Sequence, residues 1–192
     1  KMKKFLMLLT VISTLQFTNV YAQKTFTVED VVLPRTIQFQ NKTLSLNGAG
    51  GKSRMWLGKC IQSLYLTQLT QDYEYLMDID TEMAIRINIV IPVVPPSKLT
   101  KLIYDRFEIA AENNIEFLRP RLEKLNNMLS GEIRAKDVFK FIYTPNDPAV
   151  WVYKNNILKG KIKGTDFKKA FFGIWLADKP ADPKLRDQLL GI

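Results

Sequence analysis

The sequence predicts an α+β domain in which a large antiparallel sheet is covered by helices on one face. Segments with the two-residue alternation of strands come first, segments with helical spacing follow, and both patterns then recur in the same order. Tight-turn signals join neighbouring strand segments, as antiparallel hairpins require. No repeat, low-complexity segment or linker interrupts residues 23–192, so we expect them to form one domain.

Strand patterns fill most of the first half of the chain. The expected strands cover residues 25–28, 31–34, 37–39, 44–46, 55–66 and 84–94. Pro34 favours a strand end or a sheet edge, because proline lacks the amide hydrogen that a sheet interior needs. Residues 40–42 are expected to form the turn of a hairpin. The stretch 84–94, "AIRINIVIPVV", is the richest in β-branched residues, so it predicts a central strand that ends at its prolines.

Helices and further strands make up the second half. Apolar residues recur at helical spacing over about 97–110 and again from about 115 to 129, and Gly131 closes the second helix. The expected strands that follow cover residues 138–143, 149–153 and 157–162, with a tight turn at 155–156. Thr165 is expected to cap the next helix, and Asp182 followed by Pro183 opens the last one.

An acidic stretch separates two of the expected strands. Its carboxylates are Asp72, Glu74, Asp78, Asp80 and Glu82. Their spacing by two resembles a calcium-binding loop, but no glycine stands where an EF-hand needs one. We therefore expect a solvated loop here, and the sequence predicts no metal site and no cofactor.

Residues 1–22 have the pattern of a secretory signal peptide. Three lysines precede the apolar run 5–12, which is too short to span a bilayer, and Val20 to Ala22 fit a cleavage site before Gln23. We expect an exported protein, periplasmic or secreted. Without the three leader lysines the formal charge falls by three, from +9 to +6. The remaining basic residues are scattered, which indicates solubility or contact with a membrane or cell-envelope polymer, and not nucleic-acid binding.

Two absences exclude several kinds of active site. The sequence contains no histidine, which excludes a Ser-His or Cys-His nucleophile pair and a histidine-based zinc site. Cys60 is its single cysteine, so no disulfide can form within this sequence. Walker and dinucleotide-binding fingerprints are also missing. With no histidine to activate it, Cys60 is not expected to be a nucleophile, and we predict no catalytic residue.

The clearest functional pattern is "LSLNGAGGKSRMWLGKCIQSLYL", residues 44–66. Its glycines allow backbone conformations that are closed to other residues, so we expect a hinge there. The two-residue period places one set of side chains on a single face, namely Lys52, Arg54, Trp56, Gly58, Cys60 and Gln62. Two cations beside an aromatic ring suit an amphipathic anion, with its carboxylate at the cations and its tail along the ring. The alternative is a solvated sheet rim with Cys60 as a small core residue.

Three ordered stretches resemble the bacterial branch of the chalcone isomerase-like family. "LNGAG" with the later "LYL" resembles the first long hairpin of that family, "PPSKLTKL" resembles the turn into its first helix, and "NNILKGKIKGTDFKKAFFGIWLADKPADPKLRDQLLGI" resembles its ending. The resemblance implies an open-faced β-sandwich with a ligand cleft between the antiparallel sheet and its helices. It also implies two kinds of relative: plant enzymes that close a chalcone into a flavanone, and non-catalytic proteins, some of which bind fatty acids.

In the plant enzymes of this family three polar residues act on the substrate. The resemblance places their positions in this sequence at Lys52, near Ile91 and near Cys60. Lys52 takes the place of an arginine that holds the substrate oxyanion, and lysine lacks the planar fork that holds two oxygens at once. Ile91 falls near a tyrosine and has no group that handles protons. Cys60 falls near a threonine. These replacements argue against flavanone-forming catalysis.

The resulting hypothesis is an exported, non-catalytic binding protein for a fatty acid or similar apolar anion. Its predicted ligand-binding residues are Lys52, Arg54, Trp56, Cys60 and Ile91, with Lys52 and Arg54 at the head group. One alternative is an isomerase or lyase for an enone-like substrate, in which Lys52 stabilises an oxyanion and an ordered water moves the proton. The other is an envelope module that meets a partner through its basic surface. No pattern in the sequence specifies an oligomeric state.

Overall fold

The computed structural model describes residues 25–51, 58–92, 104–109 and 115–192. Its strands are β1 (Thr25–Val28), β2 (Val31–Pro34), β3 (Thr36–Phe39), β4 (Lys42–Gly51), β5 (Gly58–Leu66), β6 (Met83–Pro92), β7 (Val138–Thr144), β8 (Ala149–Lys154) and β9 (Ile157–Lys163). Its helices are α1 (Tyr73–Asp78), α3 (Ile115–Leu129), α4 (Thr165–Leu176) and α5 (Pro183–Leu190), and residues 104–109 are also helical. The predicted signal peptide lies outside the described residues. None of the helices within them is both long and apolar enough to cross a membrane.

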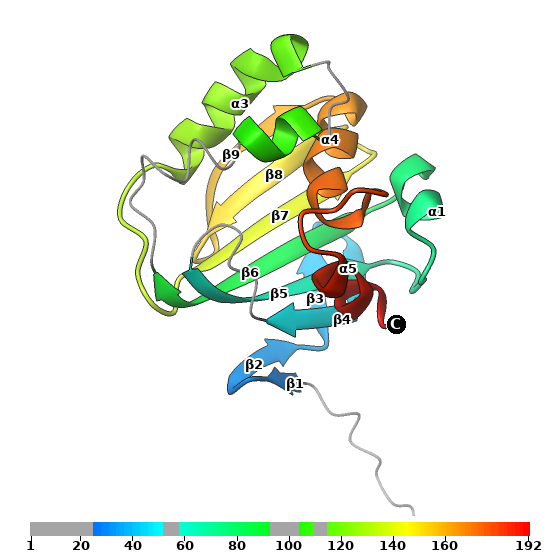
Figure 1. Ribbon diagram of the computed structural model, residues 1–192, viewed down its shortest axis with the longest axis vertical. Helices are drawn as coiled ribbons and strands as arrows, with labels where there is room; N and C mark the ends of the chain where they lie inside the picture. The colour runs from blue at the N-terminus through cyan, green and yellow to red at the C-terminus, as the bar shows by residue number, and fades with distance from the viewer. Residues whose placement is uncertain (1–24, 52–57, 93–103, 110–114) are drawn as a thin grey trace, which may run out of the picture.

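Seven strands form one antiparallel sheet in the order β3-β4-β5-β6-β7-β8-β9 (Figure 1). Strands that are neighbours in the sheet are also neighbours in the sequence, so the sheet needs no crossover connection. β6 lies in the middle of this order, which confirms the prediction of a central strand. β1 and β2 pair only with each other, and Glu29 and Asp30 between them have positive φ angles of 43° and 68°, as a two-residue hairpin turn requires.

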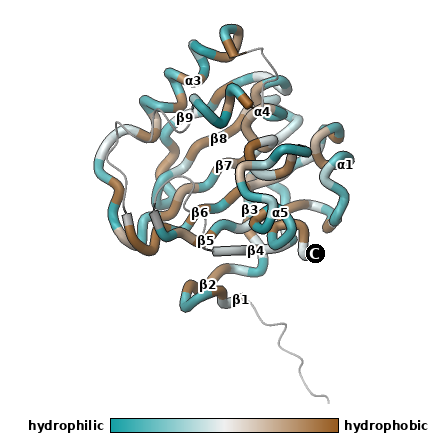
Figure 2. Tube along the Cα trace, viewed as in Figure 1, coloured by the Kyte–Doolittle hydropathy of each residue, from teal (hydrophilic) through white to brown (hydrophobic). Residues whose placement is uncertain are grey.

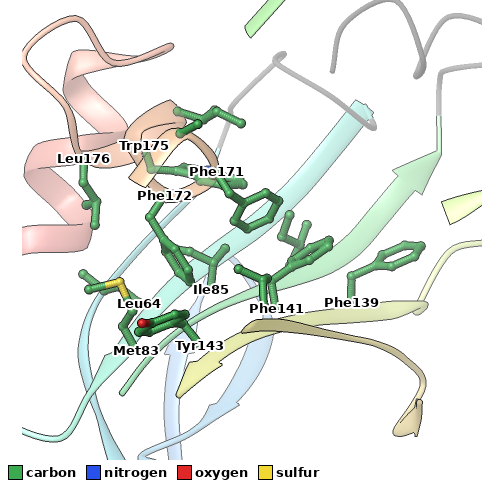
Figure 3. Packing of buried hydrophobic residues seen from close by; sticks show 14 of the residues in the cluster. Leu64, Met83, Ile85, Phe139, Phe141, Tyr143, Phe171, Phe172, Trp175 and Leu176 are labelled. Carbon is green, nitrogen blue, oxygen red and sulfur yellow. The ribbon is translucent and has the colours of Figure 1, made fainter. Parts of the chain in front are cut away.

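The helices cover one face of this sheet, as the sequence predicts (Figure 1). Figure 3 shows Phe171 and Trp175 of α4 directed toward sheet residues that include Phe141 and Tyr143. The Phe171 and Phe141 ring centroids are 4.9 Å apart. Along α3, hydrophobic and hydrophilic residues alternate on the tube of Figure 2. The buried residues of α3 are Leu118, Leu122, Leu125 and Leu129, the same leucine spacing that predicts this helix.

The other face of the sheet carries a smaller apolar cluster. Its buried members are Ile37, Phe39, Leu44, Tyr65, Ala84 and Ile142. The ring centroid of Phe39 lies 5.7 Å from that of Trp151 and 6.5 Å from that of Tyr153. Because β3 and β8 stand far apart in the strand order, this contact shows that the sheet curls until its β3 edge reaches β8. We call this side the helix-free face.

The glycine-rich stretch after Asn47 is not a hinge. Gly48, Gly50 and Gly51 continue strand β4, and none of them has a positive φ. Close packing explains these glycines instead, since a Cβ on Gly48 would stand 2.2 Å from the backbone oxygen of Gln188 in α5. Asn47 donates from Nδ2 to the carbonyl of Leu189 at 3.0 Å, which fixes α5 against the strand. Gly48 therefore lets the backbone of α5 touch the backbone of β4, and Gly50 makes room for the side chain of Gln188.

The acidic stretch contains helix α1, where the sequence predicts only a loop. Asp72 caps its start by accepting from the amide of Tyr75 at 2.9 Å. Lys168 of α4, which is 2% exposed, donates to the carbonyls of Leu76, Met77 and Ile79 at 2.9–3.2 Å and so satisfies the end of the helix. A helix this short has too few turns for an apolar period, and the lysine that caps it comes from a distant segment.

The predicted cap of α4 is also shifted by one residue. Gly164 occupies the N-cap position with a φ of 118° and no side-chain hydrogen bond, and Thr165 is the first helical residue. Arg121 of α3 stabilises this helix start by donating from both Nη atoms to the carboxylate of Asp166 at 2.6 and 2.7 Å. An acidic residue in the first turn also interacts favourably with the helix dipole.

Candidate functional site

A buried polar cluster interrupts the apolar, helix-covered face of the sheet. Cys60 and Gln62 lie on β5, Trp175 lies on α4, and the three residues are 0%, 1% and 2% exposed. The indole Nε1 of Trp175 donates to Oε1 of Gln62 at 2.5 Å. Nε2 of Gln62 donates to Sγ of Cys60 at 3.7 Å, a weak bond to sulfur. These three residues are called the polar cluster below.

The surroundings of the polar cluster are aliphatic and aromatic. Cys60 is directly opposite Ile89 of β6, and Gln62 is directly opposite Ile87, so both isoleucines share its face of the sheet. The ring of Trp175 lies 5.3 Å from that of Phe171, centroid to centroid. Burying an amide in such a place costs free energy unless it is hydrogen-bonded. An apolar residue at position 62 would fill the same space without that cost, so the polarity of Gln62 calls for a structural or functional reason.

The thiol of Cys60 is unsuited to nucleophilic chemistry. Burial raises its pKa to about 11, and the hydrogen bond from Gln62 opposes that rise only in part. At neutral pH the residue is therefore a neutral thiol, whereas the reactive form is the thiolate. Cys60 contributes volume and a weak acceptor to the cluster.

A second polar network lies on the same face but has a structural role. Burial lowers the pKa of Lys168 to about 8, and burial followed by the hydrogen bond to Asp80 raises that of Tyr143. The three carbonyls at the end of α1 match the three N–H donors of the Lys168 ammonium group. The hydroxyl of Tyr143 donates to Asp80 at 2.5 Å. The Lys168 hydrogen bonds hold α1 against α4, and the Tyr143 hydrogen bond holds Asp80 against β7.

The structure describes two of the five predicted ligand-binding residues. Lys52, Arg54 and Trp56 fall between the end of β4 and the start of β5, outside the described residues. Cys60 lies on the helix-covered face beside Gln62, as the two-residue period predicts. Ile91 is 53% exposed.

The structure does not bring Ile91 together with Cys60. A register shift separates the pairs Lys59–Ile91 and Cys60–Ile89, so Val90 is the extra residue of a bulge in β6. Directly opposite residues share a face, which places Ile91 with Lys59 and not with Cys60. A strand bulge has no signature in the run of β-branched residues, so the period alone does not reveal this change of face.

Sequence reasoning misses the part played by Trp175. Trp175 lies in the main core cluster with Phe167 and Phe171 of the same helix. The hydrogen bond to Gln62 joins residues 113 positions apart, and no local spacing reports such a pair. A buried tryptophan usually needs a hydrogen-bond acceptor for its indole N–H. This requirement is the one feature of the sequence that could have pointed to a polar partner for Trp175.

A separate cavity of about 400 Å³ lies beside the turn between β1 and β2. Its lining residues include Glu29, Asp30, Lys59, Asn88 and Lys136. Lys59 and Glu29 form an ion pair at 3.4 Å across it. Among the residues that the structure describes, no group of three or more cysteine or carboxylate side chains is placed to hold a metal ion.

Comparison with known proteins identifies the family. Among solved structures, a fatty-acid-binding protein of Arabidopsis thaliana superposes with a TM-score of 0.71 at 14% identity, and the match covers 86% of this chain and 95% of that one. At this identity the likeness establishes the fold, with a curled antiparallel sheet and helices on one face. No curated protein matches the sequence. The sequence profile described as chalcone isomerase-like matches residues 25–191, and the chain therefore belongs to the chalcone isomerase-like family.

Proposed function

We propose that this protein is exported and binds a fatty acid or a similar apolar anion on the helix-covered face of its sheet, without catalysing a reaction. The single observation that carries the proposal is the polar cluster of Cys60, Gln62 and Trp175 within the apolar core between sheet and helices. An amphipathic ligand needs that combination, namely apolar walls for its tail and a few placed polar groups for its head. The related fold of a fatty-acid-binding protein supports this ligand class.

Gln62 provides a donor for the head group in this proposal. Its Nε2 carries two hydrogens, and one of them points to Cys60. Within the described residues no acceptor is assigned to the other hydrogen. Lys52 and Arg54 stand eight and six positions before Cys60 in the chain. Lys59, which directly precedes Cys60, is paired with Glu29 at 3.4 Å, so we assign the head group to Lys52 and Arg54. A carboxylate held by a cation and an amide donor gains charge-assisted hydrogen bonds that a neutral ligand would not.

The described acid and base groups favour binding over catalysis. The thiol of Cys60 is held neutral by burial, and the ammonium of Lys168 is occupied by three carbonyls. A general base must lie within hydrogen-bond reach of the proton that it removes and have a pKa near the working pH. Neither residue combines a free position with such a pKa. An isomerase would need an acid and a base other than these two residues.

Calorimetric titration with dodecanoate and its shorter homologues tests the proposal. Each added methylene should tighten binding, with about 0.8 kcal/mol per buried CH₂ as the upper limit. The double variant Lys52→Ala/Arg54→Ala should bind dodecanoate at least about tenfold more weakly, which corresponds to about 1.4 kcal/mol. Gln62→Leu should weaken dodecanoate more than dodecanol, because only the carboxylate gains from the amide donor.

The matched control is Lys42→Ala/Lys124→Ala, which removes the same kind of side chain from exposed positions of β4 and α3. Its affinity for dodecanoate should equal that of the unmodified protein. Equal weakening by the two double variants would show that overall charge, and not a head-group site, attracts the ligand. Affinity that does not depend on chain length would refute an apolar tail site.

A further inference from the structure

Two cations face each other on the helix-free face of the sheet. Arg86 of β6 is directly opposite Lys140 of β7, and the same row continues with Ser63 of β5 on one side and Tyr153 of β8 on the other. Their neighbours one row along, Tyr65, Ala84 and Ile142, belong to the apolar cluster of this face. Side chains directly opposite in an antiparallel pair have Cβ atoms about 4.5–5.5 Å apart, so the two cationic side chains leave the sheet from adjacent positions.

Within the described part of the chain, neither cation has a carboxylate partner. Nε of Arg86 donates to Oδ1 of Asn88 at 3.0 Å, and Nζ of Lys140 lies 5.3 Å from the ring centroid of Tyr153. Both of these partners are neutral. The ion pairs of the described residues include neither Arg86 nor Lys140. Like charges directly opposite on a sheet are destabilising, so this pair is unfavourable in the protein alone.

Two other lysines of the same face are neutralised. Lys59 pairs with Glu29 at 3.4 Å, and Lys161 pairs with Asp147 at 2.5 Å while lying 4.6 Å from the ring centroid of Trp151. Lys42 and Lys163 also lie on this face and form no ion pair within the described residues, but both are exposed. Arg86 and Lys140 differ from them in being directly opposite each other and half-buried.

The two cations are also partly withdrawn from water. Both side chains are half-buried, whereas most lysines of the described chain are more exposed. Burial lowers the pKa of Arg86, and burial together with the charge of Arg86 lowers that of Lys140. Both shifts mean that the charged forms lie in a less favourable setting than in water. Bringing a negative charge to the pair would relieve this directly.

We propose that Arg86 and Lys140 bind a phosphate group, carried by a small soluble molecule or by a lipid head group, on the face opposite to the proposed fatty-acid site. Two adjacent cations are matched by a group that carries about −1.5 to −2 charges near neutral pH, as a phosphate monoester does. With Nε committed to Asn88, the two Nη groups of Arg86 present a planar fork suited to two phosphate oxygens. The lysine ammonium supplies a point charge beside it.

Titration with inorganic phosphate, followed by calorimetry and thermal unfolding at constant ionic strength, tests this site. The full protein should show saturable binding and a rise in the unfolding temperature that follows it. Arg86→Gln and Lys140→Gln should each weaken phosphate binding at least about tenfold. Because each substitution removes a like-charge contact, both variants should fold as stably as the parent in phosphate-free buffer, so failure to bind is not failure to fold. Lys124→Gln on α3 is the control and should bind phosphate as the parent does.

A second arm distinguishes the source of the phosphate. The protein is sedimented with vesicles of phosphatidic acid in phosphatidylcholine. If the protein sediments with these vesicles and both Gln variants do not, the site is assigned to a lipid head group. Phosphate binding without sedimentation would assign it to a soluble molecule. A response that does not saturate, or that Arg86→Gln and Lys140→Gln leave unchanged, would overturn the proposal. Dodecanoate binding on the other face does not depend on these residues, so either proposal can fail while the other stands.

Discussion

The hydrogen bond between Trp175 and Gln62 should contribute measurably to stability, and a pair of substitutions isolates it. Trp175→Phe keeps an aromatic ring but removes the donor to Oε1 of Gln62, which lies 2.5 Å away on a residue that is 1% exposed. A buried acceptor without its partner costs about 1–3 kcal/mol. The smaller ring adds a cavity, and the total loss should be about 2–4 kcal/mol.

Gln62→Leu in the Trp175→Phe background should recover part of this loss. The second substitution replaces the orphaned amide with an apolar side chain of similar size, so about 1–2 kcal/mol should return as coupling between the two sites. Urea unfolding followed by far-ultraviolet circular dichroism measures all four proteins of the cycle, since this signal does not depend on the altered tryptophan.

Trp151 on the helix-free face provides a matched control. Its Nε1 is buried and has no hydrogen-bond partner among the described residues. Trp151→Phe therefore removes a ring segment but no hydrogen bond, and it should destabilise the protein less than Trp175→Phe does. Effects of Trp175→Phe and Gln62→Leu that add to within about 0.5 kcal/mol would show that this hydrogen bond does not stabilise the protein, because independent sites add in that way.

Three further predictions concern packing, pH and reactivity. Gly48→Ala should destabilise the protein by about 1–3 kcal/mol or more in urea unfolding, because the new Cβ would stand 2.2 Å from the Gln188 carbonyl oxygen; wild-type stability would contradict this contact. The pKa of Lys168 is lowered from 10.5 to about 8, so between these pH values the unfolded chain binds one more proton than the folded protein. The free energy of unfolding should therefore rise with pH in this range, by up to about 3 kcal/mol. The variant Lys168→Met should lack this rise. Cys60, with its pKa raised to about 11, should react with a thiol reagent at pH 8 only after unfolding, and rapid labelling of the folded protein would show that the thiol is accessible.

Much of the fold could be predicted from the sequence because its signals are local. The alternation of β7, β8 and β9, the β-branched run of β6 and the leucine spacing of α3 each predict an element close to where the structure has it. The α+β class follows from the order of these elements. The errors are at positions where distant segments decide the local structure.

Contacts between distant segments explain the errors at β4 and α1. The glycines of β4 suggest a bend when β4 is considered alone, but α5 rests on them, at a separation of well over a hundred residues. Helix α1 depends on Lys168 of α4 for its C-terminal hydrogen bonds. The bulge at Val90, which places Ile91 and Cys60 on different faces, is also hidden in a run of β-branched residues. None of these features has a periodic pattern in the sequence.

The candidate site was predictable to a similar extent. The two-residue period correctly places Cys60 and Gln62 on one face, because β5 is regular between them. Three other properties depend on the packing of α4, which no pattern in β5 reports. They are the burial of that face, the hydrogen bond between Gln62 and Trp175, and the neutral state of the Cys60 thiol. The like-charge row of Arg86 and Lys140 is equally hidden, since only the register of β6 and β7 brings the two residues together.

Native mass spectrometry of the purified protein shows whether it carries an apolar anion, as proposed above. We expect a complex whose mass exceeds that of the chain by one long-chain carboxylate, with the same acid recovered by organic extraction and missing from the Lys52→Ala/Arg54→Ala variant. A folded protein that carries no such ligand, and that takes up none when a mixture of fatty acids is added, would contradict the proposal.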